Sequence, residues 1–414
     1  MRRCCAVVAP LLRFSALLFP RAKAQQLIRG AEAQQRFLRF FMNSIVIMGC
    51  GVVGATIAYE LSQNPDLKIT VIDQNPPALG STGAALGVLM GIISQKTKGR
   101  AWRLREFSMQ RYETLIPELE GITGKIIPFN RQGILLLSYG EDELEKWQNL
   151  IDLRRSQGLE LQWLDPDQVQ VKYPQINPEK VLGAVYSPQD RQVDPTALTL
   201  ALVEAAKSRG VKFQFGVKVE SLETIKTANN QQVCQQIKTS IGELNSDWVM
   251  LATGLGTTPL ISTIPRENEP EKLINIRPVL GQALQVRCLQ PLGNLGFEPV
   301  ITGNDIHIVP LGNAEYWIGA TVEFPEHGDE ILANSELLDL VLKGAIAICP
   351  ALENATIIKQ WSGLRPRPDG IPAPVIGNLP GFENILLATG HYRNGVLLAP
   401  ATADQIRGMI GAGG

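Results

Sequence analysis

Histidine and cysteine are scarce in this sequence of 414 residues. The three histidines are too few for a metal centre built on imidazole ligands, and the six cysteines lack the C-x-x-C spacing of zinc sites and redox motifs. We therefore expect no bound metal and no disulfide framework. A reducing compartment is the simpler assumption for such a chain.

Excess charge of one sign and long apolar runs are also missing. The 39 basic and 40 acidic residues nearly cancel, which gives no reason to propose nucleic acid or an anionic membrane as a partner. From residue 42 onward no uninterrupted apolar run reaches the roughly 18 residues of a membrane span. The length and the 45% hydrophobic content instead favour about two globular domains with a large core.

Residues 1–41 differ from the rest because they carry many basic residues and a single acid, Glu32. This pattern is typical of an organelle transit peptide, and Ala22-Lys23-Ala24 also resembles a secretory cleavage site. We favour Met42, directly before the first predicted strand, as the native start. The expected location is then the cytoplasm, with an organelle as the alternative if residues 1–41 are a transit peptide.

Residues 44–73 have the pattern of a dinucleotide-binding βαβ unit. An apolar run leads to a G-x-G-x-x-G motif, an Ala/Leu-rich helix and a second apolar run. Gly49 permits a tight turn, Gly51 lets a pyrophosphate approach the backbone, and Gly54 lets the helix pack against the strand. Asp73 ends the second strand, where a carboxylate can accept hydrogen bonds from ribose hydroxyls. The pattern alone does not distinguish NAD from FAD.

Two further segments of small residues are candidates for cofactor contact. Residues 80–87 read GSTGAALG, and their hydroxyl groups suit phosphate or ribitol oxygens, although a flexible loop is an equal alternative. A predicted strand at 248–252 ends in Ala252-Thr253-Gly254. Ligands bind at the carboxyl ends of strands in open α/β sheets, so this strand end belongs to the same predicted site.

The remaining periodicity predicts an α/β chain, α+β overall. Strands are expected at 131–138, 211–219 and 385–388, and an antiparallel meander at 274–279, 282–287, 305–310 and 316–322. Helices are expected at 98–119, 141–157, 195–209, 335–348 and 399–409.

Two glycine-rich segments near the C-terminus complete a pattern that resembles a known family. Residues 361–370 read WSGLRPRPDG and residues 390–400 read GHYRNGVLLAP. With the segments at 49–54 and 81–87, they follow the order found in the D-amino-acid oxidase family of FAD-dependent enzymes. The last segment is very similar to that of the glycine oxidases associated with thiamine synthesis. The likeness spans residues 43–408.

The resemblance implies a Rossmann-like FAD-binding domain assembled from discontinuous segments, with an antiparallel β-sheet substrate domain. The FAD-binding domain would comprise 42–128, 187–263 and 362–414, and the substrate domain 129–186 and 264–361. FAD would be non-covalent, because no cysteine follows Cys349 for a C-terminal link. The residues expected to hold it are Gly49, Gly51, Val52, Val53, Gly54, Asp73, Gln74, Ser81, Thr82, Ala85, Gly87, Val219, Ala252, Gly254, Arg393, Asn394, Gly395, Val396 and Leu397.

The resemblance also implies three catalytic candidates. Arg365 would bind a substrate carboxylate, for which a planar guanidinium offers a two-pronged clamp. Arg393 would lie near both flavin and substrate. His307 takes the place where glycine oxidases commonly carry a tyrosine; it would hydrogen-bond the substrate and make binding depend on pH, or form a plain pocket wall. Leu280 stands where a basic residue is usual, which leaves glycine open as the preferred substrate.

The expected reaction is oxidative deamination of a small amino acid, namely glycine, sarcosine, a D-amino acid or a cyclic imino acid. Hydride would pass from Cα to the flavin, and oxygen would reoxidise the flavin with release of hydrogen peroxide. A dehydrogenase with another electron acceptor, a non-catalytic flavin-binding subunit and an NAD-dependent dehydrogenase are the alternatives. The expected partners are the small-molecule substrate and the acceptor, with a homo-oligomer possible.

Overall fold

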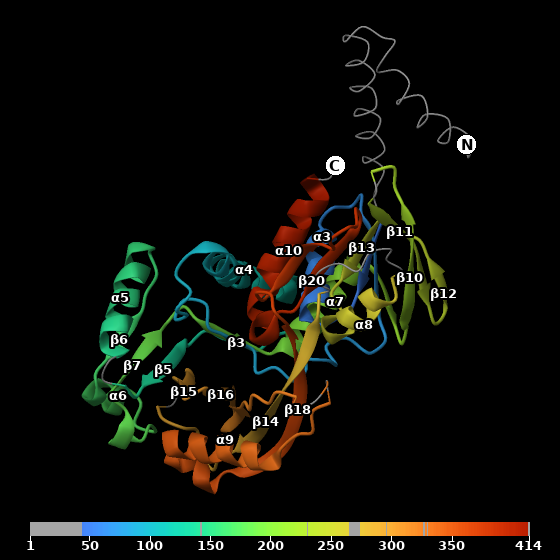
Figure 1. Cartoon of the computed structure of the whole chain (residues 1–414). Coiled ribbons are helices and arrows are strands. Elements are labelled where there is room, and N and C mark those ends of the chain that lie inside the picture. Colours follow the sequence, from blue (N-terminus) through green and yellow to red (C-terminus); the bar gives the residue numbers. More distant parts are fainter. Residues whose placement is uncertain are drawn as a thin grey trace, which may run out of the picture.

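The computed structural model describes residues 44–140, 143–229, 231–264, 274–294, 296–325, 328 and 330–412. The predicted extension at 1–41 therefore lies outside the described residues. Within them the predicted α/β class is confirmed, because parallel and antiparallel sheets are combined with helices (Figure 1).

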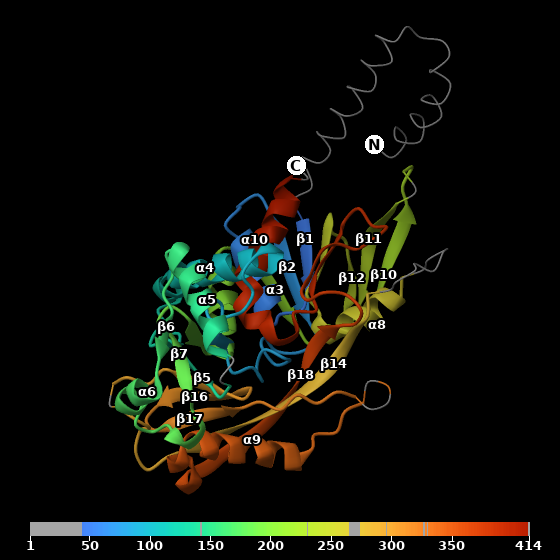
Figure 2. The ribbon, with the colours of Figure 1, turned by 60° about the vertical axis from the view of Figure 1, so that its left-hand side comes forward.

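A six-stranded sheet forms the upper half of the molecule in Figures 1 and 2. Five neighbouring strands are parallel, and β19 joins the edge antiparallel to β20. In order across the sheet, the strands are β19 (Val375–Asn378), β20 (Ile385–Thr389), β13 (Trp248–Leu251), β1 (Ser44–Met48), β2 (Lys68–Asp73) and β9 (Lys212–Phe215).

Both faces of this sheet are covered, which is why its strands are almost wholly apolar. Ile45 and Ile47 of β1 face a layer of helices, whereas Val46 and Met48 face a small three-stranded sheet. The helices are α3 (Val52–Leu61), α4 (Gly99–Thr123), α7 (Pro195–Ser208) and α10 (Gly395–Ala412). The small sheet is β10 (Val219–Lys226), β11 (Gln232–Thr239) and β12 (Gly242–Leu244), with α8 (Thr257–Ser262) beside it.

An eight-stranded sheet forms the other half, and α9 (Ser335–Ile348) packs on the face that points away from the six-stranded sheet (Figure 1). In order the strands are β18 (Thr356–Pro368), β14 (Ile276–Arg287), β17 (Glu315–Gly319), β16 (Ile306–Gly312), β15 (Val300–Gly303), β5 (Ile134–Ser138), β7 (Gly183–Ser187) and β6 (Gln162–Leu164). The short elements around it are α5 (Glu143–Ser156), α6 (Pro166–Lys172), η2 (Pro178–Lys180) and η4 (Pro350–Asn354).

A narrow ribbon of β3 (Val88–Leu89), β8 (Arg191–Val193) and β4 (Phe129–Asn130) lies between the halves. Arg365, assigned from the sequence to the FAD-binding segment 362–414, stands on β18 of the eight-stranded sheet. The predicted domain boundaries otherwise stay a prediction. Among the described residues, no helix combines the length and the apolar character needed to cross a bilayer.

Local signals placed several helices well. Asp194 caps α7 by accepting from the backbone N–H groups of Thr196 and Ala197, and Pro195 follows as the first helical residue. The helices predicted at 98–119, 141–157 and 335–348 correspond to α4, α5 and α9.

Three predicted elements differ from the structure. The strands predicted at 274–279 and 282–287 are one continuous strand, β14, because β18 pairs with it across Gly281. The strand predicted at 211–219 ends at Phe215, since Gly216 adopts a φ of 74°. The helix predicted at 399–409 already begins at Gly395.

Candidate functional site

The glycine-rich turn after β1 is packed too tightly for side chains. Gly49 adopts a φ of 99°, and a β-carbon there would lie 2.5 Å from the carbonyl oxygen of Ala252. A β-carbon at Gly54 would lie 2.0 Å from the carbonyl oxygen of Gly49. The tight turn and close helix packing expected of these glycines are therefore present at the N-terminus of α3.

Thr82 closes over that helix N-terminus. Its Oγ1 accepts a hydrogen bond from the backbone N–H of Val52 at 3.0 Å, and a β-carbon at Gly51 would lie 3.0 Å from the same oxygen. One N–H group predicted for phosphate is thus already bonded, while Val53 follows on the first turn of α3. The hydroxyl hydrogen of Thr82 remains able to donate to a phosphate oxygen.

Asp73 lies at the carboxyl end of β2, beside the turn. Its carboxylate accepts from the backbone N–H of Cys50 at 2.7 Å and of Asn75 at 2.8 Å, which fixes both oxygens. The backbone N–H of Val217 donates to the carbonyl of Asp73, which brings the start of β10 at Val219 close to this strand end. Gln74 is exposed next to it.

The small-residue segment from residue 80 to residue 87 packs against β18. Trp361 Nε1 donates to the carbonyl of Ala84 at 3.1 Å, and a β-carbon at Gly363 would lie 2.3 Å from the methyl group of Ala84. Ser81 was expected to offer its hydroxyl to the cofactor, but here it donates to the carbonyl of Leu364 at 2.6 Å. These contacts tie the strand of Arg365 to the predicted cofactor segment.

Of the other predicted positions, Gly87 is confined in the same way and Gly254 is not. Gly87 has a φ of 70°, and a β-carbon there would lie 1.8 Å from the carbonyl oxygen of Val193. Ala85 lies in the turn before it and donates its N–H to the carbonyl of Thr82. Gly254 has a φ of 54° and begins η3 (Gly254–Gly256), and Ala252 lies just after the end of β13 at Leu251.

The C-terminal motif at residues 390–400 contains a second helix N-terminus, that of α10. The chain passes through η5 (Tyr392–Asn394) and enters α10 at Gly395, with Val396 and Leu397 buried in its first turn. Pro400 has no N–H, so the carbonyl of Val396 loses its helical partner. The hydroxyl of buried Tyr112 donates to that carbonyl instead.

Arg365 stands on β18 with its guanidinium over the backbone of β14. Nη1 donates to the carbonyl of Leu280 at 3.0 Å, and a β-carbon at Gly281 would lie 2.3 Å from Nη1. Burial lowers the pKa of Arg365, and the positive charge of Arg393 lowers it further. Guanidinium groups nevertheless stay protonated in proteins, so the side chain is a half-buried cation.

Arg393 and His307 lie around this cation. Arg393 Nη2 donates to Asp305 Oδ1 at 3.2 Å, and Nδ1 of His307 is 2.9 Å from the hydroxyl of Thr302. Burial and then the charge of Arg393 lower the pKa of His307 to about 4; the charge of Asp305 opposes this shift, and that of Arg365 adds to it. The imidazole is therefore neutral near pH 7. The pH dependence of substrate binding that was expected from His307 would then fall at acid pH.

The three predicted catalytic residues thus come together from β18, β16 and η5. Two neighbours escaped the sequence reasoning: Gly281, which makes room for Arg365, and Asp305, which pairs with Arg393. Asp305 stands two residues before His307, and that spacing was the available signal. Among the described residues, no His/Cys/Asp/Glu group could hold a metal ion.

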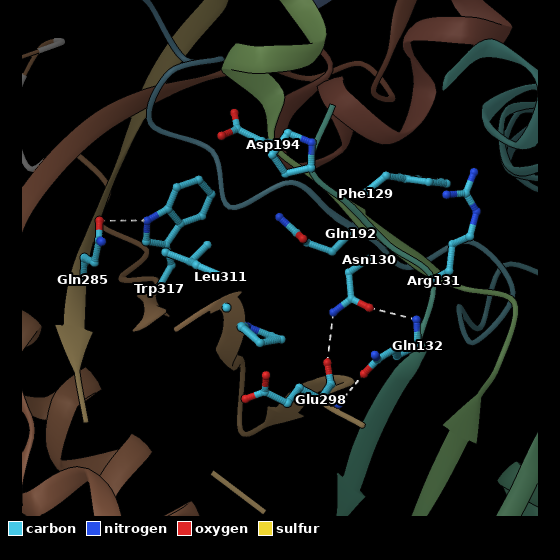
Figure 3. A pocket seen from close by; sticks show the side chains of 13 residues that line it. Phe129, Asn130, Arg131, Gln132, Gln192, Asp194, Gln285, Glu298, Leu311 and Trp317 are labelled. Carbon is cyan, nitrogen blue, oxygen red and sulfur yellow. Dashed lines mark hydrogen bonds between the residues drawn. The ribbon is translucent and has the colours of Figure 1, made fainter. Parts of the chain in front are cut away.

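A pocket of about 650 Å³ lies between β4, the end of β16 and Trp317 of β17 (Figure 3). Asn130 Nδ2 donates to the carbonyl of Glu298, and Trp317 Nε1 donates to Gln285. None of the predicted site residues lines this pocket.

Comparison with known proteins finds one family model and several relatives that match most of this chain. The family model described as DAO, FAD dependent oxidoreductase, matches residues 44–408. The bifunctional protein ThiO/ThiG of Trichormus variabilis is 32% identical over 88% of this chain and 52% of its own length, so the chain spans about half of that relative. The glycine oxidase of Geobacillus kaustophilus is 28% identical over 88% of this chain and 92% of its own.

Solved structures show the same likeness. The crystal structure of glycine oxidase from Bacillus cereus is 27% identical, covers 89% of this chain and 95% of its own, and superposes with a TM-score of 0.76. That of glycine oxidase from Geobacillus kaustophilus is 25% identical, with 89% and 95% coverage and a TM-score of 0.77.

The residues present fit FAD. The Gly49–Gly51 turn and the α3 N-terminus suit a pyrophosphate, the Thr82 hydroxyl can donate to it, and the Asp73 carboxylate suits ribose hydroxyls. With the family model covering residues 44–408, the chain belongs to the DAO family of FAD-dependent oxidoreductases.

Proposed function

We propose that this protein oxidises a small α-amino acid or N-alkyl amino acid at Cα. The observation that carries the proposal is Arg365, a half-buried guanidinium beside a second arginine. Among the described residues, no acidic side chain forms an ion pair with Arg365. A half-buried cation whose direct partner is a neutral carbonyl and not a carboxylate favours an anion, such as the carboxylate of a substrate.

The protein's own part in this reaction is positioning. The Leu280 carbonyl holds Nη1 of Arg365, which leaves the rest of the fork to clamp a carboxylate and orient the Cα–H bond. His307, being neutral, can hydrogen-bond the substrate without adding charge. When bound, FAD supplies the acceptor for the hydride that leaves Cα of the neutral amine. Water then hydrolyses the imino acid to a 2-oxo acid and ammonia, or to a primary amine.

Glycine, sarcosine and D-amino acids are the proposed substrates. Relatives named glycine oxidase support this class, whereas His307 and Leu280 are the reasons to test beyond glycine. Oxygen is the proposed electron acceptor, with another acceptor as the alternative. The cytoplasmic location and a possible homo-oligomer stay predictions.

The test is purification from Met42, a visible spectrum, and anaerobic reduction by glycine, sarcosine, D-alanine and D-proline. We expect a yellow protein that at least one of these amines bleaches. Arg365→Met should raise the amine concentration needed by at least about tenfold, since a charge-assisted pair is lost. Arg367→Met, an exposed arginine two residues along the same strand, is the matched control. Equal reduction of the Arg365→Met variant and the wild type would reject the proposed site.

A further inference from the structure

An exposed carboxylate stands at the edge of the arginine cluster. Asp305 Oδ1 accepts from Arg393 Nη2 at 3.2 Å, and 77% of the Asp305 side chain is accessible to solvent. The pair joins the turn between β15 and β16 to η5, which are 88 residues apart in sequence. Both elements also contribute to the surroundings of His307.

The turn itself does not require the negative charge. Asn304 and Asp305 form a two-residue hairpin loop, with φ angles of 50° and 63°. Two positive φ angles indicate a type I′ turn, in which asparagine, aspartate and glycine are all favoured. Asparagine at position 305 would keep the turn, so the carboxylate needs another explanation.

The neighbouring charges suggest what the carboxylate does. Arg365 and Arg393 are two cations close enough for each to influence His307. A site with two unpaired guanidinium groups would attract substrates with two carboxylates. Asp305 pairs with Arg393, whereas Arg365 has no acidic ion-pair partner among the described residues.

We propose that Asp305 is a specificity-determining residue that excludes amines with two carboxylates. It occupies Arg393 and repels a second carboxylate, so that the site accepts substrates with the single carboxylate that Arg365 binds. This inference rests on the proposed amine oxidation. An ion pair that only stabilises the fold is the rival explanation, and exposed pairs of this kind contribute little to stability.

The test compares substrates with two carboxylates and substrates with one, and the first pair differs in charge but hardly in shape. The quantity measured is kcat/KM for D-aspartate divided by that for D-asparagine, and likewise iminodiacetate against sarcosine. In Asp305→Asn both ratios should rise about tenfold, which corresponds to ~1.4 kcal/mol. Added salt should raise the ratios in the wild type, because it screens the repulsion by Asp305, and lower those of the variant, because it screens the attraction by the unpaired Arg393.

Asp404→Asn is the matched control. Asp404 is also a surface aspartate with one arginine partner, since Arg407 Nη2 donates to its Oδ1 at 2.6 Å, but the pair lies on α10 away from the arginine cluster. This control should keep the wild-type ratios. If Asp305→Asn also keeps them while monocarboxylate amines are still oxidised, the charge-filter role of Asp305 is wrong.

A binding measurement separates this inference from the proposed function. If no amine bleaches the wild-type flavin, the proposed oxidation has failed, and the charge filter is then decided by ligand binding alone. Acetate and malonate are titrated against the flavin absorbance bands of the wild type and of Asp305→Asn. A relative gain for malonate of about tenfold supports the filter, and unchanged relative affinities overturn it.

Discussion

The guanidinium of Arg365 occupies the space that a β-carbon would need at Gly281, where the nearest guanidinium atoms lie 2.3 Å from the ideal β-carbon position. The two residues lie on neighbouring antiparallel strands, β18 and β14, with Val279 directly opposite Arg365. Gly281, which has no side chain, thereby determines where Arg365, the proposed binding group for the substrate carboxylate, lies.

Gly281→Ala should therefore impair substrate binding more than folding. The new methyl group must push the guanidinium away, and a displacement of about 1 Å can lower kcat/KM by roughly 100-fold. Steady-state kinetics with the best amine measures the loss, and urea unfolding measures the stability. Gly121→Ala in α4, where a β-carbon meets nothing within 4 Å, is the control and should keep wild-type kinetics. Unchanged kinetics in Gly281→Ala would mean that Arg365 does not need its present position.

Thr82→Val should weaken FAD binding by about tenfold, roughly the loss of one hydrogen bond. Valine has nearly the same shape, but it neither accepts from the Val52 N–H nor donates to a phosphate. Fluorescence titration of apoprotein with FAD measures the affinity. Thr196→Val, at an exposed position on α7, serves as the control. An FAD affinity equal to that of the wild type would place the pyrophosphate elsewhere.

The Tyr112 hydroxyl should be worth about 1–3 kcal/mol of unfolding free energy, because Tyr112→Phe leaves the buried Val396 carbonyl without a donor. Pro400→Ala supplies a backbone N–H that can bond the same carbonyl. Denaturant unfolding of both single variants and the double variant forms a thermodynamic cycle. We expect Tyr112→Phe to cost less when it is combined with Pro400→Ala; full additivity would contradict the shared carbonyl.

Folding stability should fall with acid because of His391. Burial, and after it the positive charge of Arg100, lowers its pKa to about 3. The unfolded imidazole takes up a proton below about pH 6.5 while the folded one stays neutral, so stability is complete above pH 6.5 and declines as the pH falls toward 3. The slope contributed is up to ~1.4 kcal/mol per pH unit.

His391→Gln should flatten that decline in urea unfolding measured between pH 7 and pH 4. The hydroxyl of Thr402 uses its hydrogen to donate to the carbonyl of Leu398. His391 therefore donates its Nε2–H to Thr402 Oγ1, and the amide of a glutamine can donate in its place. A variant with the same slope as the wild type would show that His391 does not control the acid sensitivity.

Much of the nucleotide-binding half was predictable because its signals are local. Such signals act over a few residues and can be recognised in the sequence alone. Examples are the G-x-G-x-x-G turn, the helix cap at Asp194 and the alternation of apolar and polar residues in strands. Elements whose ends depend on distant partners were misplaced. The strand β14 continues through Gly281 only because β18 pairs with it along its whole length.

The sequence by itself determined the dinucleotide turn, the helices and the identity of the candidate arginines, because short-range sterics, capping and hydrophobic periodicity decide these features. Only the tertiary structure decided that Arg365 lies over Gly281 and that Asp305 pairs with Arg393. Such contacts join residues far apart in the chain, and sheet register and turn geometry bring them together rather than any local preference.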